Sequence, residues 1–138
     1  MATYNKFYDF VEQLGKGVHQ LHAAGHLLKV YLSNAVPSAS LDAVIADLAE
    51  IAAGNGYTAG GSDIQNDYTE ATGTGTLTGV DVTWTATGTI GPFQYVVLYN
   101  DTPTTPLDPL IAWWDYGSAL TLNAGDSFMV DFGTSVFT

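Results

Sequence analysis

The chain has 138 residues, of which 46% are aliphatic or aromatic, so it has room for one domain with a sizeable core. It has no cysteine, which excludes a disulfide scaffold and thiolate zinc sites. Three lysines stand against fourteen acids, for a net charge of −11, and no basic residue follows Lys29. Nucleic acid and anionic membranes are therefore not expected as partners, because both attract basic surfaces.

The first 25 residues are predicted to be either an arm that reaches a neighbouring molecule or a first folded element. All three lysines lie within the first 29 residues, where they could reach an acidic neighbour, which favours the arm. Helical spacing favours the folded element, although Gly15 and Gly17 each weaken a helix by about 1 kcal/mol. The apolar residues with this spacing are Phe7, Phe10, Val11, Leu14, Val18 and Leu21. No export signal is expected, since the first residues lack a basic start and a long apolar run.

The next segments are short apolar runs separated by turn-forming residues. Residues 26–32 are predicted to form a strand and residues 41–52 a short helix that opens at Ser40 and ends at Gly54. Residues 60–79 are rich in Gly, Thr, Asp and Asn, which favours an exposed loop or hairpin.

From Leu77 to the end, apolar residues recur with a period of two, which is typical of half-buried strands. Residues 93–99 are apolar on both faces and are predicted to be a central strand. In the last strand Phe128, Val130 and Phe132 are predicted to share one face. The remaining predicted strands are residues 80–86, 110–114 and 119–122. The fold class is therefore all-β, with residues 1–138 forming a single antiparallel β-sandwich or jelly-roll-like domain with at most one or two short helices.

Two residue groups have spacings related to those of metal sites. On a continuous helix His19, His22 and His26 would share a face, but Gly25 and the following strand argue against that helix, and exposed or locally bonded histidines are preferred. Asp63, Gln65 and Asp67 copy the start of a calcium-binding loop, but Tyr68 and Thr74 replace the required Gly and Glu. The prediction is no metal.

One group has the composition of a catalytic site. Asp101, Asp108 and Asp115 surround Trp113 and Trp114, a combination that a glycosidase could use. The first two aspartates occupy ordinary loop positions, and adjacent tryptophans on a strand point to opposite faces, so one is expected in the core and the other is free to anchor an interface. No motif for nucleophilic or phosphate chemistry is present, so neither enzyme activity nor a cofactor is expected.

Several stretches resemble a family of small tailed-phage virion proteins. They include Tyr4-Asn5-Lys6-Phe7, residues 54–61, residues 91–101, Trp113-Trp114-Asp115-Tyr116-Gly117 and residues 128–132. The likeness runs over almost the whole chain, and no catalytic residues come with it.

The resemblance implies a non-enzymatic phage structural protein, assembled in the host cytoplasm and located in the virion. A cement or decoration protein on the outer capsid surface is favoured, with the major capsid protein and its own copies, as a homotrimer, for partners. The alternative is a tail or tail-fibre module with glycan-binding aromatic residues. The candidate interface residues are Trp113, Trp114, Tyr116, Tyr99, Lys6 and Lys16.

Overall fold

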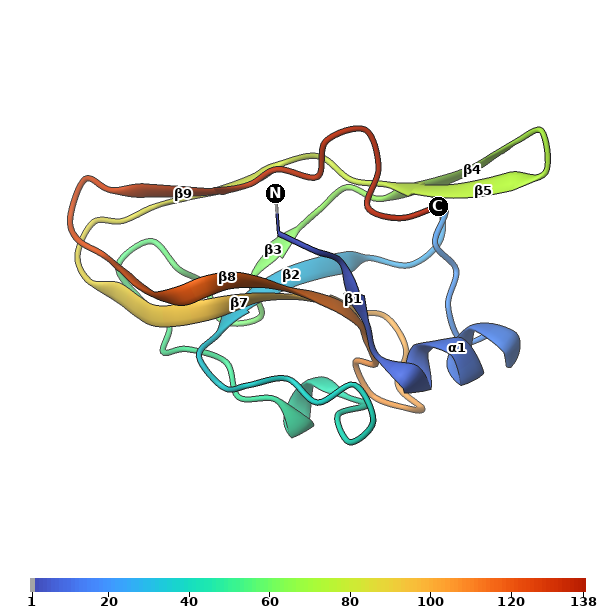
Figure 1. Cartoon of the computed structure of the whole chain (residues 1–138), viewed down its shortest axis with the longest axis horizontal. Helices are drawn as coiled ribbons and strands as arrows, with labels where there is room; N and C mark the ends of the chain where they lie inside the picture. The colour runs from blue at the N-terminus through green and yellow to red at the C-terminus, as the bar shows by residue number, and fades with distance from the viewer. Residues whose placement is uncertain (1) are drawn as a thin grey trace.

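A computed structural model describes residues 2–138 as two layers of antiparallel strands, which confirms the all-β prediction (Figure 1). One layer is a five-stranded sheet, in the order β1 (Asn5–Lys6), β8 (Leu110–Leu122), β7 (Ile90–Asn100), β2 (Leu28–Ser33) and β3 (Ser62–Asp63). The other layer contains two hydrogen-bonded pairs, β6 (Val82–Thr85) with β9 (Ser127–Val130), and β4 (Asp67–Ala71) with β5 (Thr74–Thr78). The arrangement is sandwich-like.

The large sheet is apolar on both faces, because its central strands alternate between two separate cores. Val96 and Leu98 of β7 belong to the main core, together with Trp84 of β6 and Val130 of β9. The residues between them along the strand, among them Val97, belong to a smaller core on the opposite face. Residues 93–99 therefore form the two-faced central strand that the sequence predicts.

The smaller core is covered by irregular chain, not by the helix predicted for residues 41–52. Only the 3₁₀ turn η1 (Ile45–Asp47) forms there, so that prediction is wrong. An Asp47 carboxylate oxygen accepts the main-chain N–H groups of Ala43 (2.9 Å) and Val44 (3.1 Å), and Ile45 N–H donates to the Asp108 carbonyl (3.0 Å). Side chains and a neighbouring loop thus take the backbone groups that a helix would pair internally.

The N-terminal segment packs on its own domain. β1 pairs with residues 112 and 113 of β8, and α1 (Tyr8–Gly15) follows it. Phe7 and Phe10 are buried, one in each core. The helical spacing continues to Leu21, but α1 ends at Gly15, and Gly17 has a φ of +78°.

Residues 110–114 and 119–122, which the sequence separates, belong to one long strand, β8. Its pairing with β7 is interrupted by register shifts, which explains the irregular alternation of its side chains. Residues 60–79 contain β3 and the β4–β5 hairpin. Among residues 2–138, no helix is long and apolar enough to cross a membrane.

Candidate functional site: an aromatic groove between the two layers

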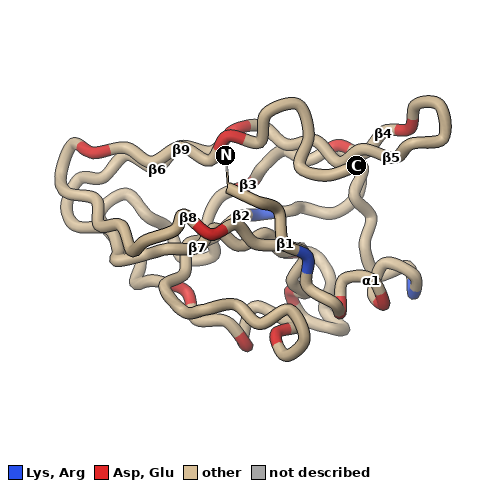
Figure 2. Tube along the Cα trace, viewed as in Figure 1, with Lys and Arg blue, Asp and Glu red and all other residues tan. Residues whose placement is uncertain are grey.

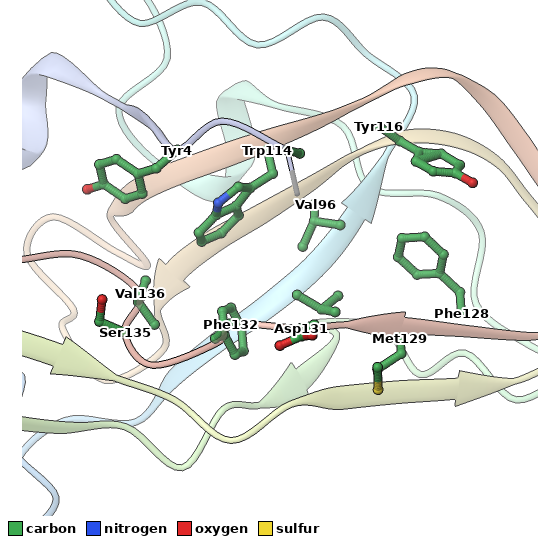
Figure 3. A pocket seen from close by; sticks show the side chains of 12 residues that line it. Tyr4, Val96, Trp114, Tyr116, Phe128, Met129, Asp131, Phe132, Ser135 and Val136 are labelled. Carbon is green, nitrogen blue, oxygen red and sulfur yellow. The ribbon is translucent and has the colours of Figure 1, made fainter.

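The chain has a groove of about 430 Å³ where β8 of the large sheet lies opposite β9 of the second layer. We call it the β8–β9 groove. Figure 3 shows Trp114 and Tyr116 entering it from β8, while Phe128, Met129 and Phe132 come from β9 and the residues after it. Val96 forms part of its floor. The groove thus combines two consecutive strands, β8 and β9, with residues from distant parts of the sequence, Tyr4 and Val96.

Edge-to-face ring contacts fix the walls of the groove. The Trp114 ring lies 5.9 Å from Tyr4 and 5.9 Å from Phe132, measured between ring centroids, and Tyr116 lies 5.8 Å from Phe128. Such pairs contribute about 0.5–1.5 kcal/mol beyond the area they bury. Tyr116 is nevertheless 53% exposed and Met129 55% exposed, so a large apolar surface on these walls still faces solvent.

Both strands that border the groove have an open edge. β1 pairs with β8 only at residues 112 and 113, and within residues 2–138 no strand pairs with residues 114–122 on that side. β9 pairs with β6 and with no other described strand. An open edge leaves main-chain N–H and C=O groups without partners, which makes it a ready template for another chain.

The polar groups at the groove are acidic or neutral. Asp131 and Ser135 line it, and none of the described lining residues is basic. On the other face of β8, an Asp115 carboxylate oxygen accepts hydrogen bonds from Gln94 (3.0 Å) and from Gly117 N–H (2.7 Å). Burial raises the pKa of Tyr4 to about 12, so its hydroxyl stays neutral. This arrangement suits binding of an apolar or cationic group.

Of the predicted interface residues, the structure brings Trp114 and Tyr116 together in the groove. Trp113 points to the other face of the sheet, as expected for adjacent strand residues, and packs against Phe7 with ring centroids 4.6 Å apart. The prediction that the two tryptophans face opposite ways is therefore confirmed, but both are half-buried and each packs against one of the two cores.

The interface prediction for Tyr99 is wrong. Tyr99 is only 1% exposed, because it lies on the covered face of the large sheet. Its hydroxyl donates to the Gly60 carbonyl (2.6 Å), and its ring packs edge-on against Tyr31. Burial raises the pKa of Tyr99, with smaller contributions from nearby carboxylates. Tyr99 fixes a loop instead of contacting a partner.

The lysines lie away from the groove. Lys6 and Lys16 are exposed, and Lys16 pairs with Glu12 one helical turn earlier on α1. Lys29 on β2 pairs with Asp101 (3.0 Å). Figure 2 shows that acidic residues are spread over the rest of the trace. The groove is thus separate from the few basic groups of the chain.

The histidines do not form a metal site. The Nδ1 atoms of His19 and His26 lie 3.0 Å and 2.9 Å from the Asn100 amide nitrogen, so both accept from it and the rings bear their protons on Nε2. Burial, and then His26, lowers the pKa of His19 to about 4. Across residues 2–138 no three His, Asp or Glu side chains are grouped to hold a metal ion.

The two carboxylate groupings also serve local structure. An Asp63 oxygen accepts from Gln65 N–H (2.7 Å), and an Asp67 oxygen accepts from Ala23 N–H (3.1 Å). Asp101 is held by Lys29, and Asp108 lies in the same loop, where burial and then Asp101 raise its pKa. Asp115 lies on β8, on the face opposite Trp114 and Tyr116.

Sequence reasoning missed Tyr4, Met129 and Asp131 as groove residues. The predicted shared face of Phe128, Val130 and Phe132 is confirmed, since Val130 and Phe132 are buried, Phe128 is partly buried, and Met129 and Asp131 are exposed. That pattern identifies Phe128 and Phe132 but gives no signal for the three missed residues. Comparison with family models, curated proteins and solved structures finds no match.

Proposed function

We propose that this chain is a non-enzymatic structural protein of a phage particle, and that it binds the outer capsid surface as a cement or decoration protein. The observation that supports a binding role is the β8–β9 groove, in which aromatic side chains and two open strand edges face solvent together. Exposed apolar surface of this kind, bordered by polar residues, marks protein interaction sites. The phage setting rests on the sequence resemblance.

In this role the protein would stabilise the shell through the same contact repeated at many positions. Each copy buries the walls of its groove against the major capsid protein, and a homotrimer multiplies modest contacts through multivalency on a symmetric shell. A net charge of −11 makes acidic surfaces of neighbouring copies repel, so the contacts use neutral and aromatic patches or meet a basic capsid surface. Raised salt is therefore expected to weaken docking.

A cryo-electron microscopy map of the particle tests the proposal. We expect density for this domain on the head surface, with Trp114 and Tyr116 at the contact. Particles that carry Tyr116→Ala should release the protein at lower temperature than particles that carry Tyr68→Ala. Tyr68 is a suitable control because it is also exposed and lies outside the groove. Absence of the domain from the head overturns the capsid role.

A tail or tail-fibre module that binds glycans is the second candidate. It is favoured by the position of Trp114 and Tyr116 beside Asp131 and Ser135, since aromatic faces next to hydrogen-bonding groups are suited to sugars. Density confined to the tail, together with glycan binding that Tyr116→Ala removes and Tyr68→Ala leaves intact, would support this role over the first.

A further inference from the structure

We propose that the β8–β9 groove receives an extended, cationic segment of a partner polypeptide, which adds to the open edge of β8 as a further strand. This inference deepens the proposed function and rests on it for the existence of a protein partner. It specifies the conformation and chemistry of what the groove binds.

The hydrogen bonds at the end of β1 identify the groups that are available. Phe7 N–H donates to the Ile111 carbonyl (3.1 Å), and the Asn5 side-chain amide donates to the Trp113 carbonyl (3.4 Å). Main-chain groups in a strand alternate between its two edges. Asp115 is therefore the next residue whose N–H and C=O face this edge, beyond the point where β1 pairing stops.

The chain's own N-terminal residues do not continue along this edge as a strand. The Asn5 side-chain amide also donates to the Thr3 carbonyl (2.9 Å), and β1 begins only at Asn5. Tyr4 instead packs edge-on against Trp114. Residues 114–122 thus have no strand partner on this edge among residues 2–138, and only Gly117 N–H is taken there, by the Asp115 carboxylate (2.7 Å). A further strand would lie about 4.8 Å from β8, the usual spacing between paired strands.

The side chains of β8 specify the pattern of the partner. Trp114 and Tyr116 face the groove (Figure 3). Asp115 pairs with Tyr95, a residue of the smaller core, and therefore lies on the opposite face of the sheet. A strand paired with β8 would place every second side chain between these rings and Phe128, so those positions are expected to be apolar. The alternate positions face the side of Asp115, where a Lys or Arg fits.

Charge favours a basic partner over a second copy of this chain. Asp131 lies in the groove and Asp115 on the other face, and the chain has no basic residue after Lys29. Two copies that paired through their β8 edges would bring these carboxylates together, which is unfavourable, whereas a cationic segment neutralises them.

The test uses the full chain and a capped nine-residue peptide of alternating valine and threonine with a lysine at each end. Two controls accompany it: the same peptide with glutamate in place of lysine, and a version N-methylated on alternate residues, which lacks the donors of one edge. Binding is followed by chemical shifts in nitrogen–proton NMR spectra, and main-chain pairing by hydrogen exchange.

We expect saturable shifts at Trp114, Tyr116 and Asp131, and slower exchange of the Asp115 amide. Affinity should fall at least about tenfold, equivalent to about 1.4 kcal/mol, for the glutamate peptide and for the Tyr116→Ala protein, and should be unchanged in Tyr68→Ala. N-methylation should remove the exchange protection. Shifts outside the groove, equal affinity for the N-methylated peptide, no binding at millimolar concentration, or self-association through β8 would each overturn the inference.

The two proposals can fail separately. If the particle map places the protein on the capsid but its contact lies away from the groove, the inference fails and the function stands. If the lysine peptide pairs with β8 while particles contain no density for this domain, the strand addition stands and the capsid role fails.

Discussion

The two edges of the five-stranded sheet differ in how far their main-chain groups are paired. Beyond β2, the chain closes the edge with its own groups, whereas beyond β8 residues 114–122 have no strand partner among residues 2–138. The short strand β3 covers only Lys29 and Val30, so the closure of β2 depends mainly on side chains and loops.

Side-chain capping completes the closed edge. Leu28 N–H donates to the Asn66 side chain (3.1 Å), and Leu32 N–H donates to the Tyr57 hydroxyl (3.0 Å). The Tyr57 hydroxyl in turn donates to Glu50 (2.6 Å). Because an unpaired buried N–H costs about 1–3 kcal/mol, these contacts stabilise the fold directly. The comparison shows that this sequence closes one edge of the sheet with its own side chains, whereas residues 114–122 of β8 have no such strand partner among residues 2–138.

A glycine-to-alanine pair should show the largest difference between the two edges. Gly61 has a φ of +77°, and a Cβ there would lie 1.8 Å from the Val30 carbonyl oxygen of β2. Gly117 on β8 has a φ of +100°, but its Cβ would meet nothing within 4 Å. Gly61→Ala should therefore destabilise by more than about 3 kcal/mol, and Gly117→Ala by about 1 kcal/mol from backbone strain alone.

Urea denaturation of both variants measures the difference. If Gly61→Ala does not fold, thermolysin digestion of the two variants at the same temperature still ranks them. The structure places Gly61 directly against β2, and equal stability of the two variants would contradict that placement.

A tyrosine-to-phenylalanine pair should give a smaller difference of the same sign. Tyr57→Phe removes the acceptor of Leu32 N–H and leaves that group buried and unpaired, so we expect a loss of about 1–3 kcal/mol. Tyr116→Phe removes a hydroxyl from a half-exposed side chain and should cost less than about 0.5 kcal/mol. Denaturation midpoints compare them, and an unaffected Tyr57→Phe would show that a water molecule or another group replaces the hydroxyl.

The sequence could predict what is local in this fold. Alternation identified most of the strands and placed Trp113 and Trp114 on opposite faces, because side-chain direction in a strand depends only on position. It could not predict that Tyr57 would cap Leu32 or that Asn66 would cap Leu28, since these pairs join distant segments. The helix predicted at residues 41–52 failed for a related reason, namely that Asp108 competes for the backbone there.

The same limit applies to the candidate site. Trp114 and Tyr116 could be found as exposed aromatic residues near each other in sequence. Their position across the groove from Phe128 depends on how the two layers pack, which the sequence does not show. Tyr99 looked equivalent to them by composition, and only the loop that covers the second face of the sheet buries it. Burial on a two-faced sheet is decided by what covers each face, which a strand pattern does not contain.

Acid should destabilise the chain through His19, an effect that depends on pH and not on a lost contact. Burial lowers the pKa of His19 to about 4 in the folded chain, from the ordinary 6.5. Burial also lowers the pKa of His26. A lowered folded pKa means that the stabilisation is complete above about pH 6.5 and is lost as the pH falls toward 4. Between about pH 7.5 and pH 4.5 we expect His19 to account for about 2 kcal/mol of lost stability.

His19→Gln isolates this contribution, because the carboxylates titrate in both proteins and cancel in the difference. The variant should have a shallower decline of unfolding free energy over this range, because it lacks the His19 contribution and keeps those of His26 and the carboxylates. Tyr116→Ala, on the open side, should decline as the unmodified chain does. Identical pH slopes for His19→Gln and the unmodified chain would contradict the neutral, buried His19 that joins residues 19–26 to the end of β7 through Asn100.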